Sequence, residues 1–281
     1  MSEAPVPSAP SLPPADAAAL DALLGALRDI AERAGTAILG YYGGGDEIAV
    51  TEKADHSPLT QADLAADRLI VSALRGLTPG VPVISEEGED AAALPAQTPC
   101  FWLVDPLDGT KEFISRNGEF TVNIALVAEG QPMAGVVHAP ALARTWLGGT
   151  AVDGARRAGV ATVGQPPAPI TARAMPPEGA VVVASRRHGD PERMAAFLGG
   201  RPIADTRNAG SSIKFCLIAA GEADIYPRFG RTMEWDTGAG HALLRAAGGR
   251  VETVAGAPLS YGKSGFENPE FVAYGRSDAS A

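Results

Sequence analysis

The stretch WLVDPLDGT, residues 102–110, joins an apolar run to two aspartates that lie three positions apart. Its first three residues have the composition of a short buried strand. Pro106 lacks an N–H group and has a fixed φ, so we expect the strand to stop at residue 104. Gly109 allows the backbone to approach a ligand closely. Two carboxylates held together at a strand end repel each other unless a cation lies between them. The stretch therefore suggests a cation site, to which other parts of the chain must contribute ligands.

The composition is that of an ordinary globular protein. The chain has 281 residues, of which 46% are hydrophobic and 20% are charged, enough for one large domain or two smaller ones. The formal net charge is −10. Nucleic-acid polymers are bound through basic surfaces, so this charge argues against such a partner. A small anionic substrate remains compatible with it, provided that metal ions and local basic residues offset the field.

The cysteine count and the apolar runs limit the class of protein further. Cys100 and Cys216 are too few for a disulfide scaffold or a Cys-rich zinc site. No apolar run has the length of a transmembrane segment, and the N-terminus lacks a signal-peptide core. Residues 1–14 are rich in Pro and Ala and are expected to be a disordered lead-in. We expect a cytoplasmic protein, and peripheral association with the inner membrane remains open. The oligomeric state is expected to be a monomer or a homodimer.

Hydrophobic periodicity predicts the elements of the first half. A helix over residues 16–42 is indicated by apolar side chains at helical spacing, at Leu20, Leu23, Leu24, Leu27, Ile30, Ala34 and Ile38. A second helix is expected to open at Thr60, which is a suitable N-cap. Strands are expected at residues 81–85 and 101–104, followed by a hairpin formed by residues 120–128 and 133–138.

A stretch rich in Gly, Pro and Ala, residues 154–169, is the candidate boundary between an N-terminal half, 15–153, and a C-terminal half, 154–281. Beyond it, strands and helices alternate, with strands expected at 181–185, 223–226, 250–254 and 271–275 and helices at 191–198, 211–220 and 236–247. Helices before a sheet, followed by an alternating half, predict a layered α/β sandwich.

Acidic residues lie where several apolar elements end. Asp63 falls on the first turn of the second helix, and the strand-end acids are Glu86, Asp105, Asp108 and Asp236. Any one of them alone is explained by a helix cap or a solvated strand end. Three successive apolar segments that run into acids favour a shared site. Hard cations with oxygen ligands suit such a set, and the absence of accompanying Cys or His disfavours zinc.

Other chemistries with similar motifs do not fit. The aspartyl-phosphate phosphatases use Asp-x-Asp-Gly-Thr, but the position two before Asp108 is Pro106, so the nucleophile is missing. The stretch APLSYGKS, residues 257–264, has Ala257 in place of the leading glycine of a P-loop. No Gly-x-Ser-x-Gly elbow occurs. The reaction type that remains after these exclusions is attack by a water molecule assisted by metal ions.

Three motifs resemble those of the inositol monophosphatase superfamily, the lithium-sensitive, magnesium-dependent phosphomonoesterases. They are ISEEGED (84–90), WLVDPLDGTKEF (102–113) and EWDTGAGHALLRAAGG (234–249). Within that superfamily, KADHSPLTQAD (53–63), DGTKEFISRNGEFTVNIAL (108–126) and GSSIKFCLIAAGEADIYPRFG (210–230) resemble the CysQ-type 3'(2'),5'-bisphosphate nucleotidases. The resemblance implies a five-layered α/β/α/β/α sandwich of the inositol monophosphatase / fructose-1,6-bisphosphatase type.

The resemblance also implies a metal site. Glu86, Asp105 and the carbonyl of Leu107 would hold one Mg²⁺, and Asp105, Asp108 and Asp236 a second, so that Asp105 bridges the two ions. A third, weaker Mg²⁺ on Glu86 and waters is the further expectation.

Catalysis and phosphate binding are assigned in the same way. Thr110, paired with Asp63, would activate the water, with Glu86 as the third catalytic residue. The alternative for Asp63 is a first-turn acid that complements the helix dipole, and both remain open. The residues expected to contact substrate are Glu86, Leu107, Asp108, Gly109, Thr110, Lys214, Arg228 and Asp236.

Lys214 and Arg228 are the candidates for binding a second phosphate or the ribose. Their alternatives are a solvated helix face and a strand-end cation. His188 belongs to a Ser-Arg-Arg-His segment that resembles the family's Ser-Arg-x-His, although a lone histidine is more often structural.

The implied activity is Mg²⁺-dependent hydrolysis of adenosine 3',5'-bisphosphate to AMP and phosphate, in sulfur assimilation, with the 5'-phosphosulfate as a further substrate. The partner is then a small phosphorylated nucleotide. One alternative is an inositol-1-phosphate phosphatase with the same metal site, which is disfavoured by TKEFISRNGEF (110–120). The other is a non-catalytic phosphate-binding protein.

Overall fold

The structure is a computed structural model. It describes residues 12–43, 50–52, 58–88, 98–185 and 191–277. Within these residues, no helix combines the length and the apolarity needed to cross a bilayer.

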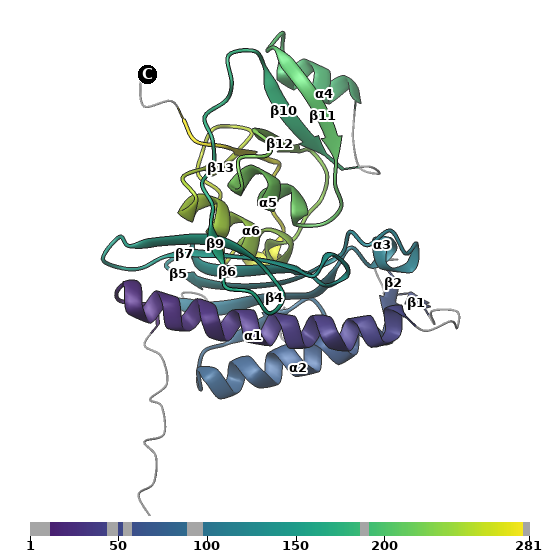
Figure 1. Cartoon of the computed structure of the whole chain (residues 1–281), viewed down its shortest axis with the longest axis vertical. Coiled ribbons are helices and arrows are strands. Elements are labelled where there is room, and N and C mark those ends of the chain that lie inside the picture. Colours follow the sequence, from purple (N-terminus) through teal and green to yellow (C-terminus); the bar gives the residue numbers. More distant parts are fainter. Residues whose placement is uncertain (1–11, 44–49, 53–57, 89–97, 186–190, 278–281) are drawn as a thin grey trace, which may run out of the picture.

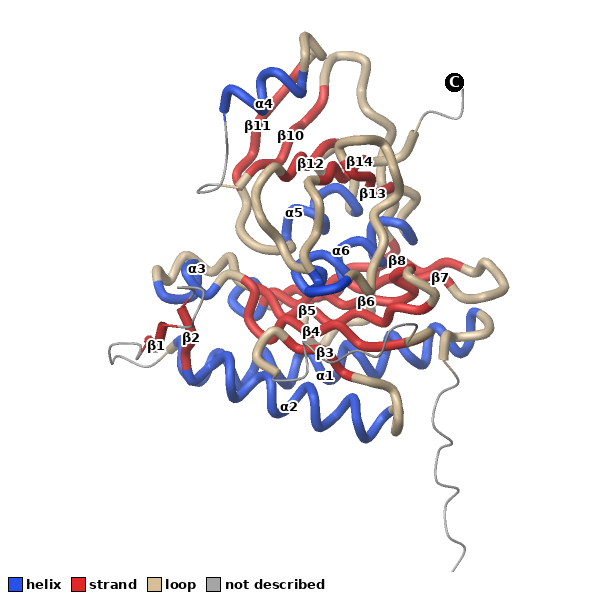
Figure 2. The backbone as a smooth tube through the Cα atoms, turned by 180° about the vertical axis from the view of Figure 1, so that it is seen from behind, coloured by secondary structure: helices blue, strands red, loops and turns tan. Residues whose placement is uncertain are grey.

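The described chain forms five layers (Figures 1 and 2). Helices α1 (Ala17–Tyr42) and α2 (Gln61–Leu77) cover one face of a seven-stranded sheet. Helices α5 (Ile213–Ala219) and α6 (Glu234–Ala246) fill the space between that sheet and a five-stranded sheet. Helix α4 (Pro191–Leu198) packs on the far face of the smaller sheet. The expected α/β/α/β/α sandwich is confirmed.

The larger sheet carries most of the first half of the chain. Its strands are antiparallel except for the parallel pair β3–β4, and their order is β3 (Val83–Ser85), β4 (Cys100–Asp108), β5 (Thr121–Ala128), β6 (Gln131–Ala139), β7 (Arg144–Thr150), β8 (Arg156–Thr162) and β9 (Ala168–Pro169). The expected boundary at residue 154 falls inside this sheet, because β8 pairs with β7 and β9 pairs with β8.

The smaller sheet belongs to the second half. Its strand order is β11 (Ile203–Asn208), β10 (Ala180–Ala184), β12 (Ile225–Arg228), β14 (Phe271–Tyr274) and β13 (Arg250–Thr253). Strand β11 was not expected, because it is an exposed edge strand and carries no apolar alternation. The remaining elements are β1 (Val50–Glu52), β2 (Pro58–Thr60), α3 (Thr110–Ile114) and the short 3-10 turns η2 (Pro140–Leu142) and η3 (Ser264–Phe266).

Strand β4 does not stop at residue 104, and that expectation was wrong. The ladder with β5 pairs Asp105 with Asn123 and resumes at Asp108 with Thr121. Between these pairs the register shifts, so Pro106 and Leu107 lie opposite a single residue of β5. Such a bulge tolerates a proline, which cannot donate to the ladder.

The bulge also changes the direction of the side chains. In a regular strand, residues three apart point to opposite faces of the sheet. Here Asp105 and Asp108 lie opposite Asn123 and Thr121, which are two apart on β5 and share a face. The extra residue in β4 therefore brings both aspartates to one side.

The starts of α1 and α2 are those that the sequence predicts, whereas α5 begins two residues later and α6 two residues earlier than expected. The Asp16 side chain accepts a hydrogen bond from the backbone N–H of Ala19 (2.9 Å) at the start of α1. Thr60 caps α2 and forms a capping box with Asp63, which is worth about 1 kcal/mol in typical helices.

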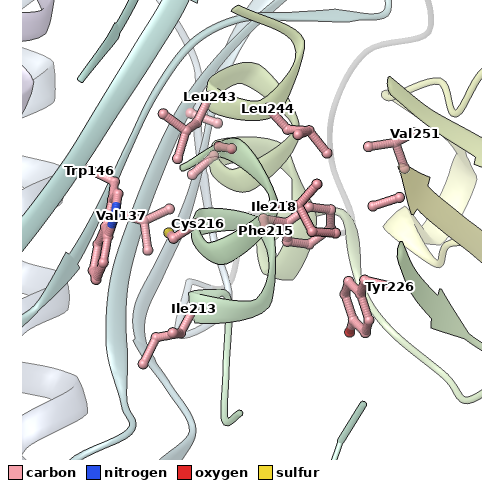
Figure 3. Packing of buried hydrophobic residues seen from close by; sticks show 14 of the residues in the cluster. Val137, Trp146, Ile213, Phe215, Cys216, Ile218, Tyr226, Leu243, Leu244 and Val251 are labelled. Atoms are coloured by element: carbon pink, nitrogen blue, oxygen red, sulfur yellow. The ribbon is translucent and has the colours of Figure 1, made fainter. Parts of the chain in front are cut away.

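The central core joins the two sheets through α5 (Figure 3). Val137 and Trp146 of the larger sheet face Cys216, while Phe215 on α5 faces Tyr226 of the smaller sheet. The Phe215 and Tyr226 rings meet edge to face, with centroids 5.3 Å apart.

Helix α6 lies against the larger sheet at backbone contact distance. A Cβ atom on Gly135 of β6 would lie 2.7 Å from the Ala239 Cα, and one on Gly148 of β7 would lie 3.0 Å from the Leu243 Cα. No side chain larger than hydrogen fits at Gly135 without a shift of the main chain.

Two glycines of α1 provide a matched test of packing. A Cβ atom on Gly35 would lie 2.5 Å from Cδ2 of His138, a buried histidine, whereas a Cβ on Gly25 would have no neighbour within 4 Å. We expect Gly35→Ala to lower the free energy of unfolding by about 1–3 kcal/mol through overpacking. Gly25→Ala should instead raise it by about 0.5–1 kcal/mol, because alanine is the better helix former. Urea denaturation of both variants checks this, and destabilisation by Gly25→Ala would contradict it.

Candidate active site

Three carboxylates converge at the ends of separate elements. Glu86 follows β3, and its backbone N–H bonds the Val104 carbonyl (3.0 Å), which continues the ladder between β3 and β4. Asp105 lies on β4 and Asp236 in the first turn of α6. Ligand oxygens of Glu86, Asp105 and Asp236 all lie within 4.8 Å of one another.

Hydrogen bonds orient two of these acids. The Asp105 Oδ1 accepts from the backbone N–H of Leu107 (3.0 Å), across the bulge. The Asp236 Oδ2 accepts from the backbone N–H of Met233 (2.8 Å) at the start of α6. Each of these hydrogen bonds reaches one oxygen of its carboxylate. The bond from the Met233 N–H, which caps α6, therefore also fixes the direction of the Asp236 side chain.

The electrostatics of the cluster favour a cation. Burial raises the pKa of Asp236, and the neighbouring charges of Asp108 and Glu86 raise it further. A divalent cation between the acids would offset this repulsion. Carboxylate oxygens are the ligands that hard cations prefer. The cluster could therefore hold a metal ion.

Asp108 lies in the same pocket but outside the tight group of three. Burial raises its pKa, while the charge of Lys214 and hydrogen bonds from Ser212 and Asn123 oppose the shift. Leu107 is buried, and its carbonyl accepts a hydrogen bond from the Thr110 hydroxyl (3.3 Å).

Asp63 makes both of the contacts that the sequence left open. Its Oδ2 accepts from the Thr60 backbone N–H (2.8 Å) and hydroxyl (2.5 Å), which completes the capping box. Its Oδ1 is 3.3 Å from Oγ1 of Thr110. The helix cap therefore holds Asp63 in place beside Thr110.

Gly109 makes a close approach possible at the turn into α3. Its φ is +91°, a left-handed conformation that glycine adopts without strain. A Cβ atom there would collide with Oγ of Ser211, which donates to the Asp108 carbonyl (2.8 Å) or the Glu119 carbonyl (2.8 Å). The Glu119 carboxylate in turn accepts from the backbone N–H of Gly210 (2.7 Å).

Several residues of the site were not singled out from the sequence. They form hydrogen bonds that connect the end of β4 to the start of α5, and they are Ser211, Glu119, Asn123, Thr121 and Ser212. The signal available in the sequence was polar residues inside the apolar strand TVNIALVA and a Gly-Ser-Ser segment before a helix.

The acids open into a pocket of about 280 Å³. Its wall combines the β4 end, the start of α3 and the loop before α5. The residues that line it include Glu86, Asp105, Leu107, Asp108, Gly109, Thr110, Ser211, Lys214, Tyr226, Arg228 and Asp236. The structure thus brings together every candidate site residue named above except Asp63, which touches Thr110, and His188, which lies outside the described residues.

Lys214 is buried, so the solvated helix face is wrong for it. Its ammonium group donates to the carbonyls of Ala209 (3.2 Å) and Ser211 (2.6 Å) and lies 5.2 Å from the centroid of the Tyr226 ring. Burial lowers its pKa to about 8, although the charge of Asp108 opposes the shift. Lys214 holds the loop before α5 and places positive charge beside Asp108.

Arg228 ends β12 and lines the pocket. Its Nη2 donates to the Arg231 carbonyl (3.0 Å). Its Nε is buried and has no hydrogen-bond partner within the part of the chain that the structure describes. A buried guanidinium donor is costly when it is left unpaired, so this group is suited to an anionic ligand.

Comparisons with known proteins agree with this geometry. Residues 19–276 match the inositol monophosphatase family. The chain is 46% identical over 243 residues to the 3'(2'),5'-bisphosphate nucleotidase CysQ of Escherichia coli K12, which covers 86% of this chain and 95% of that protein.

Solved structures give the same result. The crystal structure of CysQ from Bacteroides thetaiotaomicron, a bacterial member of the inositol monophosphatase family, superposes with a TM-score of 0.78 at 39% identity, covering 92% of this chain and 98% of that one. An inositol monophosphatase from Anabaena shares the fold, with a TM-score of 0.68 at 22% identity over 92% of each chain. Because the family match spans nearly all of the described fold and the acids of its motifs converge in one pocket, this chain belongs to the inositol monophosphatase family.

Proposed function

We propose that this protein is a Mg²⁺-dependent 3'(2'),5'-bisphosphate nucleotidase that releases phosphate from adenosine 3',5'-bisphosphate. The observation that carries the proposal is the convergence of Glu86, Asp105 and Asp236 in a pocket that Arg228 also lines, with an Nε that has no hydrogen-bond partner among the described residues. The high identity to the CysQ nucleotidases over most of the chain supports the nucleotide as the substrate.

The residues suited to holding Mg²⁺ are those with oxygen donors in this pocket. Glu86, Asp105 and the Leu107 carbonyl would hold one ion, and Asp105, Asp108 and Asp236 a second, with Glu86 also contributing to a third, weaker site. Bound divalent ions would lower the pKa of the attacking water and neutralise charge on the phosphate.

The contact between Thr110 and Asp63 supports a role for the pair in proton transfer. The Thr110 hydroxyl lies 3.3 Å from Oδ1 of Asp63, so it could pass a proton from the attacking water to that carboxylate. The backbone N–H groups of Gly109 and Thr110 would contact the phosphate. The capping box would hold Asp63 during such a transfer, because its hydrogen bonds from Thr60 reach the other carboxylate oxygen.

Arg228 is the residue best suited to the phosphate that does not react. Its unpaired Nε can donate to an anionic oxygen without losing an existing bond. Lys214 is already bonded to two carbonyls, so it would act on substrate mainly through its charge and through the loop that it holds.

A phosphate-release panel tests the proposal. The substrates are adenosine 3',5'-bisphosphate, its 5'-phosphosulfate, inositol 1-phosphate and fructose 1,6-bisphosphate, each with Mg²⁺ or with EDTA. We expect the highest kcat/KM for adenosine 3',5'-bisphosphate and no turnover in EDTA. A preference for inositol 1-phosphate would assign the protein to the inositol phosphatases instead.

Asp105→Asn should abolish turnover without disturbing the fold. The substitution removes one charge from the residue that would bridge both ions, and it keeps an oxygen for the Leu107 N–H. Since repulsion in the cluster is relieved, the Tm of the metal-free protein should rise slightly. The control for the loss of one charge is Asp29→Asn, because Asp29 is an exposed acid on α1. Turnover near that of the wild type in saturating Mg²⁺ would rule out the bridging role.

Asp63→Asn should lower kcat by about 10²–10⁴-fold, the usual range for a general base, with little change in the Mg²⁺ concentration at half-saturation. Thr110→Val is the partner variant, because it breaks the 3.3 Å contact and leaves the helix cap intact. Both variants should lose kcat, while only Asp63→Asn should lose Tm. A strong shift in Mg²⁺ dependence with unchanged kcat would place Asp63 among the metal ligands.

Arg228→Ala should reduce kcat/KM for adenosine 3',5'-bisphosphate by about one to two decades, the equivalent of a charge-assisted hydrogen bond of roughly 1.5–3 kcal/mol. Inositol 1-phosphate lacks a second phosphate and should lose little. Arg231→Ala, three residues along the same segment and exposed, is the matched control. Equal losses for both substrates would show that Arg228 serves the reacting phosphate or the fold.

A further inference from the structure

The carboxylate of Asp108 is held through one of its two oxygens. Oδ2 accepts a hydrogen bond from the Ser212 hydroxyl (3.0 Å) and another from the Asn123 side-chain amide (3.2 Å). The Thr121 hydroxyl lies 3.5 Å from Oδ2 as well, so the three hydrogen bonds to this carboxylate from described residues all reach the same oxygen. Oδ1 is then the oxygen that remains for a ligand in the pocket.

The orientation of Asn123 follows from its other neighbours. The Thr121 hydroxyl lies 3.1 Å from Oδ1 of Asn123, and Nδ2 of Asn123 lies 2.9 Å from Oγ of Ser212. If Thr121 donates to the amide oxygen, both N–H bonds of the amide point to Ser212 and Asp108. Thr121 and Asn123 are two apart on β5, on the face to which the bulge turns Asp108.

Ser212 connects this group to α6. Its hydroxyl oxygen is 2.8 Å from the carbonyl oxygen of Asp236, as well as 3.0 Å from Oδ2 of Asp108. A hydroxyl has one hydrogen to donate and accepts through its lone pairs, so Ser212 can receive the Asn123 bond while it shares its hydrogen between the Asp108 carboxylate and the backbone carbonyl of Asp236. One buried side chain therefore contacts the carboxylate of Asp108 and the main chain of Asp236, the two residues that would hold the second ion.

The group is almost closed to solvent. Thr121, Asn123 and Ser212 expose 0%, 1% and 2% of their surface, respectively. Buried polar groups are retained at a cost unless each is hydrogen-bonded, and here each hydroxyl and amide has a partner in the group. If β5 served only to pack the core, apolar side chains at these positions would need no hydrogen-bond partners.

We infer that Asn123 and Ser212 are positioning residues for the metal site, which hold Oδ2 of Asp108 and tie that acid to the start of α6. The inference rests on the proposed function, because it assigns Asp108 and Asp236 to one Mg²⁺. Groups that hydrogen-bond a metal-ligating carboxylate fix its rotation, and their loss typically weakens metal binding about 10- to 100-fold. Thr121 acts mainly through the orientation of Asn123, because its own contact with Oδ2 of Asp108 is longer (3.5 Å) than its contact with the Asn123 amide (3.1 Å).

The test compares Ser212→Ala, Asn123→Leu and Thr121→Val. Mg²⁺ binding to the metal-free protein is measured by calorimetry, and the Mg²⁺ concentration at half-maximal hydrolysis of adenosine 3',5'-bisphosphate is measured separately. We expect about 10- to 100-fold weaker Mg²⁺ binding in the first two variants and a smaller loss in Thr121→Val. In saturating Mg²⁺, KM for the nucleotide should change less than kcat.

Thr145→Val is the matched control. It also removes a fully buried hydroxyl that bonds a carboxylate, here Glu32 (2.9 Å), but it lies on β7 and does not line the pocket. It should lower Tm and leave Mg²⁺ affinity unchanged. The double variant Asn123→Leu with Ser212→Ala should lose less Mg²⁺ affinity than the product of the two single losses, because both act on one oxygen.

Wild-type Mg²⁺ affinity in folded Ser212→Ala and Thr121→Val, with a fall in Tm alone, would overturn the inference and leave a structural role. Thr121→Val keeps the shape of the side chain, so it serves if Asn123→Leu does not fold. If the wild type binds Mg²⁺ but does not hydrolyse the nucleotide, the proposed function fails, and calorimetry still decides the positioning role.

Discussion

The mutual repulsion of the carboxylates is the constraint that the rest of the structure has to meet. Glu86, Asp105 and Asp236 place oxygens within 4.8 Å of one another. Such an arrangement persists only if rigid elements impose it, because the acids alone would separate. The β4 bulge turns Asp105 and Asp108 to one face, and the cap of α6 fixes Asp236. In β4, the direction of the carboxylates depends on an irregular strand. In α6, the direction of the Asp236 carboxylate depends on a hydrogen bond from the backbone N–H of Met233.

The fold could be predicted where the pattern is local. The α1 stripe and the Thr60 cap of α2 follow from helical spacing and capping chemistry, and both occur as expected. Strands β7 and β8 were missed because glycine and arginine interrupt their apolar pattern, and β11 because it is an exposed edge. The end of β4 was misplaced for a different reason: a proline excludes a regular ladder but not a bulge.

The acids of the site could be predicted because each lies in a short motif at the end of an apolar segment. Asn123 and Ser212 could not, since their partners lie on other layers and become visible only when the strand register is known. Lys214 was identified for its charge, but its burial depends on the packing of α5 against both sheets, which spacing along the chain does not reveal.

The contact between α6 and the larger sheet has a consequence for how the sequence can diverge. At Gly135 and Gly148 the separation of helix and sheet is set by main-chain atoms rather than by interlocking side chains. An apolar exchange elsewhere in the core should therefore change this separation less than a side chain added at either glycine. Since Asp236 lies on α6, these two glycines help to set the distance between its carboxylate and the acids of the larger sheet.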